Sequence, residues 1–233
     1  MVSVLPVSLC DGDELYACRC YLEVNFSGPS HTELSIISFF AACNYGDPQV
    51  RPRLIIFAAK NFVRMPDDPV CTHGPGKRPY TTTKEVLDYL CTPVAKHLYP
   101  NMGNHTTGDC KDATKMTEQK GFSLLNPNGL APGILASGKP IFHYAEKGPD
   151  GNLRSINVRE AAALQSFPLD YEFLGTQTQK YKQVGNAVPC GLAGAIARSV
   201  RDSLRYMYLE ELEEEGDDDV EAGEEEKKEN SDN

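Results

Sequence analysis

Residues 183–189 read Gln-Val-Gly-Asn-Ala-Val-Pro and stand directly before a long amphipathic segment. Within this string, Gly185 permits a close backbone approach, and Asn186 offers both a donor and an acceptor on one short side chain. Taken alone, the string predicts a turn that leads into a helix. Such a turn is common in proteins of every class, so the meaning of the string depends on what accompanies it.

The segment after Pro189 is predicted to be a helix that runs to about Leu212. An apolar residue recurs at every fourth position, which places a stripe along one face of a helix. The members of the stripe are Leu192, Ile196, Val200, Leu204 and Tyr208. The stripe indicates that the helix packs on another element, and it carries no information about function.

A second string lies far upstream, where residues 45–53 read Tyr-Gly-Asp-Pro-Gln-Val-Arg-Pro-Arg. Its Gly and Pro residues are typical of a turn. The string runs into residues 54–59, Leu-Ile-Ile-Phe-Ala-Ala. This short apolar run predicts a strand that is buried on both faces. The two arginines therefore stand at the entrance of a buried strand, where side chains can face a cleft.

A third string lies between the other two, where residues 159–168 read Arg-Glu-Ala-Ala-Ala-Leu-Gln-Ser-Phe-Pro. Asn157 is expected to cap a short helix that ends before the proline. In that helix Ala161, Ala162 and Leu164 would face inward. An Arg-Glu pair at a helix start is also consistent with ordinary capping and ion pairing.

In chain order these strings are Pro-Gln-x-Arg-x-Arg, Arg-Glu-x-x-x-Leu-Gln-x-Phe-Pro and Gln-Val-Gly-Asn-Ala-Val-Pro. Together they resemble the last three motifs of DNA cytosine-5 methyltransferases. The resemblance covers residues 33–205, and residues 1–32 match no motif. It implies an α/β fold, namely the C-terminal part of a Rossmann-like methyltransferase domain with an inserted irregular target-recognition domain.

The resemblance also implies catalytic roles for residues of the first string. Arg53 matches the arginine that contacts the cytosine oxygen, and a fixed planar guanidinium aimed at developing charge suits that role. Arg51 and Gln49 match residues that brace the active site. Considered without the other strings, both arginines would more commonly pair with carboxylates at the end of a strand.

Two further sets of residues take roles from the resemblance alone. Gly185, Asn186 and Ala187 match the motif that lines the pocket for the cofactor S-adenosyl-L-methionine. A second set matches a motif that organises the recognition domain. Its members are Arg159, Glu160 and Gln165.

The earlier motifs of the family are absent from this sequence. It contains no Phe-x-Gly-x-Gly cofactor loop, no Pro-Cys-Gln nucleophile loop and no Glu-Asn-Val carboxyl site. The pair formed by Pro189 and Cys190 lies inside the last motif and lacks the Gln. Because enzymes of this family attack the cytosine ring with a cysteine thiolate, the isolated chain is expected to be inactive.

Charge is distributed unevenly along the chain. The formal net charge is −10, and residues 210–233 contain 14 Asp or Glu against two Lys, so residues 1–209 carry +2. A block of like charge predicts a disordered tail. The mildly basic remainder is compatible with double-stranded DNA. The tail is expected to weaken DNA binding by competing for the same basic surface.

These observations divide the chain into four parts. Residues 1–60 are expected to end the catalytic methyltransferase domain, and residues 61–150 to form the target-recognition domain. Residues 151–209 return to the catalytic domain, and residues 210–233 form the acidic tail. The alternative for the second part is a solvated surface insertion without a role in recognition.

The proposed recognition part lacks periodicity except over residues 83–96. Those residues predict one helix, capped by Thr82 or Thr83, in which Val86, Leu87 and Leu90 share a face. Elsewhere the part is rich in loop-forming residues and is punctuated by basic ones. The basic residues are Lys77, Arg78, Lys111, Lys115, Lys120, Lys139 and Lys147.

The composition limits which cellular compartments and which metal sites are compatible with the chain. The eight cysteines include no C-x-x-C pair, so we expect reduced thiols and no metal site. No apolar run is long enough to cross a membrane, and the first residues lack the basic start of a secretory signal. An intracellular location is therefore expected, and the nucleus if the source is eukaryotic.

Three functions are compatible with the sequence. In the first, the chain is part of an incomplete or split methyltransferase that needs a separate N-terminal half. In the second, it is a DNA-binding or regulatory module without catalysis. In the third, it is a remnant that does not fold alone. A neighbouring reading frame with the missing motifs would favour the first. The target DNA sequence is not predicted, because base readout depends on a few side chains in an irregular loop.

Overall fold

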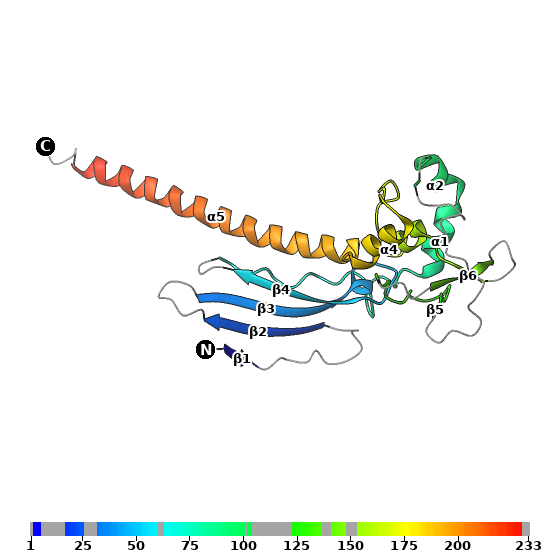
Figure 1. Ribbon diagram of the computed structural model, residues 1–233. Coiled ribbons are helices and arrows are strands. Elements are labelled where there is room, and N and C mark those ends of the chain that lie inside the picture. The colour runs from blue at the N-terminus through cyan, green and yellow to red at the C-terminus, as the bar shows by residue number, and fades with distance from the viewer. Residues whose placement is uncertain are drawn as a thin grey trace.

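Figure 1 shows the computed structural model, which describes residues 2–5, 17–25, 32–59, 63–100, 102–103, 123–136, 141–147 and 153–229. A larger sheet lies beside a long helix, and a smaller sheet gathers with the shorter helices at the other end. In the part of the chain so described, no helix combines the length and apolar character needed to cross a bilayer.

The described strands form two sheets. The larger sheet has the order β1 (Val2–Leu5), β2 (Ala17–Asn25), β3 (Thr32–Ala41) and β4 (Pro52–Ala59), with antiparallel neighbours throughout. The smaller sheet contains β5 (Ser123–Leu124), β6 (Ile141–Lys147) and β7 (Leu153–Ser155), of which only β5 and β6 are parallel. The α/β content agrees with expectation. The parallel sheet of a Rossmann-like domain is not found among the described residues, because the strands of the larger sheet follow one another too closely for helical crossovers.

The helices are α1 (Thr83–Cys91), α2 (Pro93–Leu98), α3 (Val158–Ala163), α4 (Gln177–Asn186) and α5 (Cys190–Glu229), with a 3-10 turn η1 (Ala42–Tyr45). The single helix predicted over residues 83–96 is therefore two helices. Pro93 causes the break, since it has no N–H to donate and pushes Thr92 into an extended conformation (ψ 149°).

Two predicted helix starts are confirmed. The Thr82 side chain accepts a hydrogen bond from the backbone N–H of Glu85, and the Glu85 carboxylate accepts one from the backbone N–H of Thr82. Asn157 and Glu160 make the same reciprocal arrangement at the start of α3. Such a capping box satisfies two backbone donors that a helix start would otherwise leave unpaired.

The acidic segment differs from the disordered tail that composition predicts. The backbone of α5 stays helical to Glu229, well beyond the predicted end at Leu212. Glu and Ala are strong helix formers, and extending an existing helix is far easier than nucleating one. In Figure 1 this part of α5 runs past the end of the larger sheet, away from α1 and α2.

The stripe predicted on α5 is confirmed only in its first half. Leu192 is fully buried against β3, β4 and η1, and Ile196 and Val200 pack against the same cluster. Leu204 and Tyr208 are instead 55% and 61% exposed. A residue at every fourth position drifts around a helix of 3.6 residues per turn, so the stripe rotates away from the sheet.

The predicted burial of β4 on both faces is wrong for this chain. Phe57 is buried and Ile55 is half-buried on the face that α5 covers. Leu54 and Ile56, on the opposite face, are 49% and 59% exposed. Only one face of this apolar strand is covered by the described residues.

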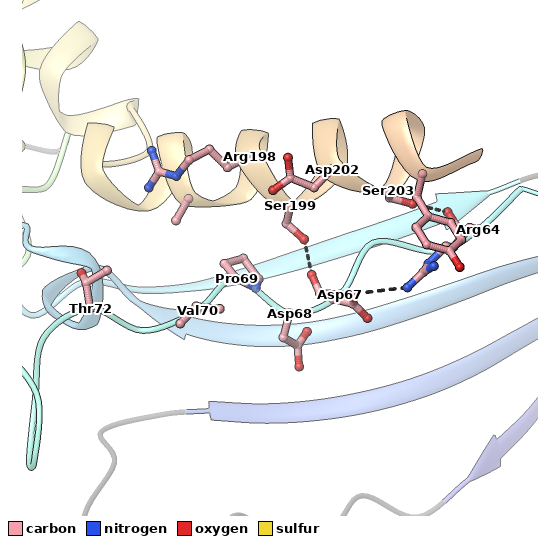
Figure 2. A pocket seen from close by; sticks show the side chains of 12 residues that line it. Arg64, Asp67, Asp68, Pro69, Val70, Thr72, Arg198, Ser199, Asp202 and Ser203 are labelled. Carbon is pink, nitrogen blue, oxygen red and sulfur yellow. Dashed lines mark hydrogen bonds and ion pairs between the residues drawn. The ribbon is translucent and has the colours of Figure 1, made fainter. Parts of the chain in front are cut away.

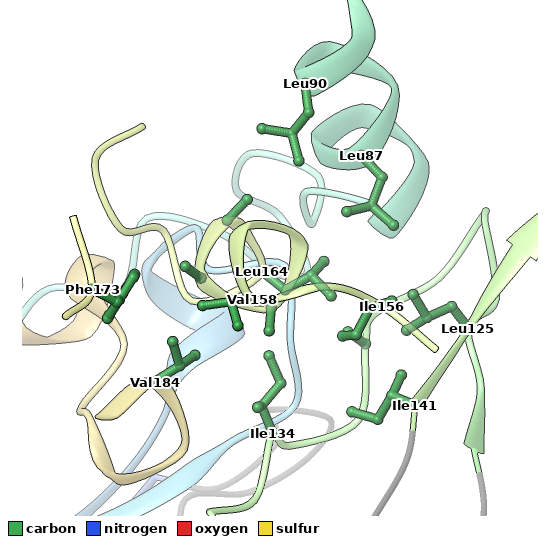
Figure 3. Packing of buried hydrophobic residues seen from close by; sticks show 14 residues of the cluster. Leu87, Leu90, Leu125, Ile134, Ile141, Ile156, Val158, Leu164, Phe173 and Val184 are labelled. Atoms are coloured by element: carbon green, nitrogen blue, oxygen red, sulfur yellow. The ribbon is translucent and has the colours of Figure 1, made fainter. Parts of the chain in front are cut away.

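A second core lies between the helices and the smaller sheet (Figure 3). Leu87 and Leu90 of α1 point towards Val158 and Leu164 around α3, as the predicted α1 face requires. Val184 of α4 joins the same cluster, together with residues of β6 and the 123–136 segment. This core fixes the positions of α3 and α4, which carry two of the three motif strings.

Candidate functional site

Arg51 links the first motif string to the third. Its side chain is 3% exposed, and Nη2 donates to the carbonyl oxygens of Gly185 at 2.5 Å and Ala187 at 3.2 Å. Nη1 donates to the carbonyl oxygen of Ile134. The partners are main-chain carbonyls instead of the carboxylates that usually meet an arginine at a strand end. The guanidinium therefore ties β4 to α4 and to the 123–136 segment.

Burial dominates the electrostatics of Arg51. Desolvation, followed by the nearby charge of Arg53, lowers the pKa of Arg51 to about 10. The group still carries its charge at neutral pH, where the three carbonyl dipoles stabilise it. Its Nε has no hydrogen-bond partner among the described residues.

Two buried glutamines complete the links between the strings. Gln49 donates from Nε2 to the carbonyl oxygen of Leu164 at 2.8 Å, which joins the first string to the second. Gln165 donates from Nε2 to the carbonyl oxygen of Val184 at 2.5 Å, which joins the second to the third. Both side chains are 0% exposed. The three strings, far apart in sequence, thus form one closed hydrogen-bonded frame.

Gly185 lets two backbones meet within this frame. A Cβ at this position would lie 2.4 Å from the N atom and 2.6 Å from the Cα atom of Ala136. Backbone atoms cannot move aside as a flexible side chain can. The close approach that the sequence suggested for Gly185 is therefore present, and it is made to the protein's own backbone.

Arg53 lies beside this frame at the start of β4 and is partly buried. Burial lowers its pKa, and its Nη1 donates to the carbonyl oxygen of Pro52 at 2.9 Å. Within the described residues this is its one hydrogen bond, so most of its donors have no protein partner there. A half-exposed arginine with unused donors is suited to a polar ligand.

The remaining residues of the third string are more open. The Asn186 side chain is exposed and Ala187 is half-buried, at the end of α4. They line neither the pocket between α5 and residues 64–72 nor the smaller pocket beside α1. The exposed Asn186 amide can make one contact with a polar ligand. Other residues would be needed to enclose that ligand.

Arg159 and Glu160 are buried side chains of α3 with structural partners. Arg159 donates from Nε to the carbonyl oxygen of Gly103 at 2.9 Å and from Nη1 to that of Pro168 at 3.1 Å. Burial lowers its pKa. These contacts connect α3 to loops from two different parts of the chain.

Sequence reasoning missed Arg154, the partner of Glu160. The two side chains are buried and joined by two charge-assisted hydrogen bonds of 2.7 and 2.8 Å. Burial alone would raise the pKa of Glu160, but the bonds from Arg154 and Asn157 hold it below its usual value. No spacing rule links an arginine in a strand to a carboxylate in the next helix, so the sequence could not show this pair.

Asp47 was also missed, because its string reads as a turn. Its buried carboxylate accepts hydrogen bonds from the backbone N–H groups of Gly191 at 3.0 Å and Leu192 at 2.9 Å. Burial raises the pKa of Asp47, although these two bonds oppose the shift. Asp47 thus caps α5 from a distant part of the chain, and a Cβ on Gly191 would lie 2.8 Å from its Oδ2.

The basic residues of the predicted recognition part are only partly described. Lys77 and Arg78 are exposed in a turn that precedes α1. Lys147 lies in β6. Lys111, Lys115, Lys120 and Lys139 lie outside the described residues, as do residues 104–109 of the loop expected around them.

A pocket of about 470 Å³ lies between α5 and residues 64–72 (Figure 2). Arg64 and Asp67 face each other at its edge, and Ser203 donates to the carbonyl oxygen of Arg64 at 2.8 Å. The Arg64 guanidinium stacks 4.1 Å from the ring centroid of Tyr206. None of the predicted site residues lines this pocket, so it is separate from the frame.

All three strings of the buried frame lie inside a region that matches one protein family. Residues 34–202 match the family model described as C-5 cytosine-specific DNA methylase, and the chain belongs to that family.

Curated relatives agree with this assignment. Type II methyltransferase M.AplI of Arthrospira platensis is 34% identical over 193 residues, which cover 82% of this chain and 54% of M.AplI. Type II methyltransferase M1.HphI of Haemophilus parahaemolyticus is 46% identical over 176 residues, which cover 68% of this chain and 45% of M1.HphI. This chain therefore spans about half the length of these two relatives.

In a shorter relative, the match covers most of the relative instead of most of this chain. Type II methyltransferase M.AquIB of Picosynechococcus sp. is 37% identical over 111 residues, which cover 40% of this chain but 76% of M.AquIB. Most of M.AquIB thus matches less than half of this chain.

Proposed function

We propose that this chain is the C-terminal portion of a DNA cytosine-5 methyltransferase and acts together with a half that carries the missing motifs. The observation that supports the proposal is the closed frame of Gln49, Arg51 and Gln165. It joins the three family strings through buried side chains and carbonyl groups. That half either precedes this chain in one polypeptide or is a separate subunit.

In this proposal Arg53 contacts the reacting cytosine. The base must leave the DNA stack to be reached, and the attacking cysteine comes from the other half. Negative charge then grows on the ring oxygen, and a donor that is already in place stabilises it best. Arg51 is bound to three carbonyls and cannot move, so it positions the start of β4, where Arg53 stands.

The cofactor fits the chain only in part. S-adenosyl-L-methionine supplies the methyl group when bound. The exposed Asn186 amide and the neighbouring Ala187 would contact it from the end of α4. The carbonyl oxygens of Gly185 and Ala187 are already occupied by Arg51, so the contact would come from the Asn186 side chain. The remaining walls would come from the other half.

Residues 61–150 are proposed to bind double-stranded DNA as the target-recognition part. The exposed Lys77 and Arg78 are of the right type to contact phosphates, and such contacts weaken steeply as salt rises. The alternative is a DNA-binding or regulatory module without catalysis. The missing nucleophile favours that alternative if no second half exists.

Methyl transfer to DNA tests the proposal directly. The purified chain is mixed with tritiated S-adenosylmethionine and DNA, alone or with the part of M.AplI that its match leaves uncovered. The chain alone should incorporate no label, and the mixture should. Label incorporated by the chain alone, or none by the mixture, would contradict the proposal.

The role of Arg53 is tested in the same mixture. Arg53→Ala should reduce turnover by about a hundredfold, because one aimed donor at such a site commonly contributes that much. Arg205→Ala is the control, since Arg205 is an exposed arginine of α5 far from the frame. Near-normal turnover of Arg53→Ala would make Arg53 a structural residue.

A further inference from the structure

On β4 and at Phe39, where side chains are described, the face of the larger sheet opposite α5 is apolar and exposed. Four alternate residues of β4 are exposed, and all are apolar: Pro52, Leu54, Ile56 and Ala58. Phe39 of β3 is paired with Leu54 across the sheet and is 40% exposed. Paired residues of neighbouring strands project from the same face, so Phe39 extends the apolar surface onto β3. We call this surface, defined by Phe39, Leu54 and Ile56, the open sheet face.

The other face of the same strand shows what such residues normally do. Phe57 is 8% exposed because α5 packs on it, and Ile55 packs against the same cluster. From Leu54 to Ala59 every residue of β4 is apolar, which is typical of a strand in a sheet covered on both faces. The described residues of this chain cover only one. Leu54 and Ile56 are neighbours on the same face of β4. A group of large apolar side chains exposed in this way marks a binding surface more often than a surface that stays in water.

We propose that the open sheet face binds the half of a cytosine-5 methyltransferase that carries the missing motifs. This inference rests on the proposed function. The family match begins at residue 34, inside β3, and the chain covers only 54% of M.AplI and 45% of M1.HphI. By motif order the uncovered half precedes β3, the strand that carries Phe39.

The inference is tested by binding measurements on the full chain. The probe is the part of M.AplI that its match leaves uncovered, expressed separately and titrated by calorimetry. The double variant Leu54→Glu/Ile56→Glu should bind at least about tenfold more weakly than the parent, because two carboxylates would be buried without partners. The control Val94→Glu/Leu98→Glu changes two side chains of α2 that are 59% and 58% exposed, and it should bind within about twofold of the parent under the same reasoning.

A second measurement does not depend on loss of binding. A photoreactive benzophenone side chain is placed at position 56 in one sample and at position 94 in another. Only the first should form a covalent adduct with the probe on irradiation. Circular dichroism and thermal unfolding of each variant verify that the fold is kept.

The possible outcomes separate this inference from the proposed function. If the glutamate variant binds the probe and supports methyl transfer as well as the parent does, the docking face is wrong and the proposed function stands. If the parent neither binds the probe nor transfers methyl groups with it, both fail. If light scattering shows a dimer of this chain that the glutamate variant abolishes, a second copy occupies the face and the inference is overturned.

Discussion

Single buried charges decide the stability of the second motif string. The carboxylate of Glu160 is 3% exposed and is neutralised by Arg154. Removing one member of a buried pair leaves the other uncompensated, at a cost of about 3–5 kcal/mol. An exposed pair such as Arg201 and Asp202 contributes about 0–1 kcal/mol.

We therefore predict that Arg154→Ala lowers the free energy of unfolding by about 3–5 kcal/mol, and that Arg201→Ala lowers it by less than about 1 kcal/mol. Urea unfolding at pH 7 measures both values. Equal effects of the two substitutions would show that the Arg154–Glu160 pair is as solvated as a surface pair.

The same pair predicts a pH dependence. The pKa of Glu160 is lowered in the folded chain from its usual 4.5, so the unfolded chain binds the proton more readily. The stability that Glu160 contributes is present above about pH 4.5 and is lost as the pH falls through the lower folded value. Between pH 5 and 3 the parent should therefore lose more stability than Glu160→Gln. Parallel curves for the two proteins would contradict this assignment.

At the scale of an element, the packing of α4 depends on one glycine. A Cβ on Gly185 would meet backbone atoms of Ala136, whereas a Cβ on Gly194 of α5 would meet only the flexible end of Arg198 at 3.4 Å. Alanine favours a helix over glycine by about 0.5–1 kcal/mol wherever there is room.

We predict opposite signs for two chemically identical substitutions. Gly185→Ala should destabilise the chain by about 1–3 kcal/mol, because α4 must move off the 123–136 segment. Gly194→Ala should leave stability unchanged or raise it by up to about 1 kcal/mol. Thermal unfolding of the two variants compares them directly, and a neutral Gly185→Ala would show that α4 is not held at this contact.

Elements whose sequence signals lie within a few neighbouring residues could be predicted. The capped starts at Thr82 and Asn157 and the apolar run of β4 were predicted, because capping and strand preference depend on near neighbours. Helix α4 was not predicted, since Gln177–Asn186 offers few apolar residues and no stripe. The whole of β2 was missed as well, in a segment without a recognisable motif.

The candidate site was predictable in its residues but not in its contacts. Motif order identified Arg51 and Gln49, yet a buried arginine bound to three carbonyls could not be foreseen from spacing. The cap that Asp47 places on α5 joins residues more than a hundred positions apart. Such partners are set by the assembled fold, so only the structure reveals them.

At the scale of the whole molecule, α5 determines where the acidic charge lies. A helical residue advances about 1.5 Å, so a segment of about 20 residues carries its charge up to about 30 Å from the body. Charges separated by more than about 10 Å are largely screened at 0.1 M salt. A helical arm therefore interferes with DNA binding less than a flexible tail that can fold back.

We predict that removing residues 210–233 changes DNA affinity by less than about twofold at 0.1 M salt and tightens it measurably only near 0.01 M, where screening reaches about 30 Å. Fluorescence anisotropy with a labelled duplex measures the full-length and shortened chains at both salt concentrations. A large tightening at 0.1 M would mean that the acidic segment lies against the DNA-binding surface.

The chain leaves β4 and comes back at Ala131 to the turn that precedes this strand, which has a consequence for how relatives can diverge. The backbone N–H of Val50 donates to the carbonyl oxygen of Ala131, and the N–H of Ala131 donates to that of Pro48, each at 2.8 Å. The long excursion after β4 therefore comes back to the turn that precedes the strand. An excursion whose return point is anchored in this way behaves as a cassette: its length and sequence can be exchanged at little entropic cost while the anchoring turn stays in place. If residues 61–150 recognise the target, as proposed, a new specificity could be acquired by exchanging one contiguous stretch of gene, while Arg51 and its contacts stay unchanged.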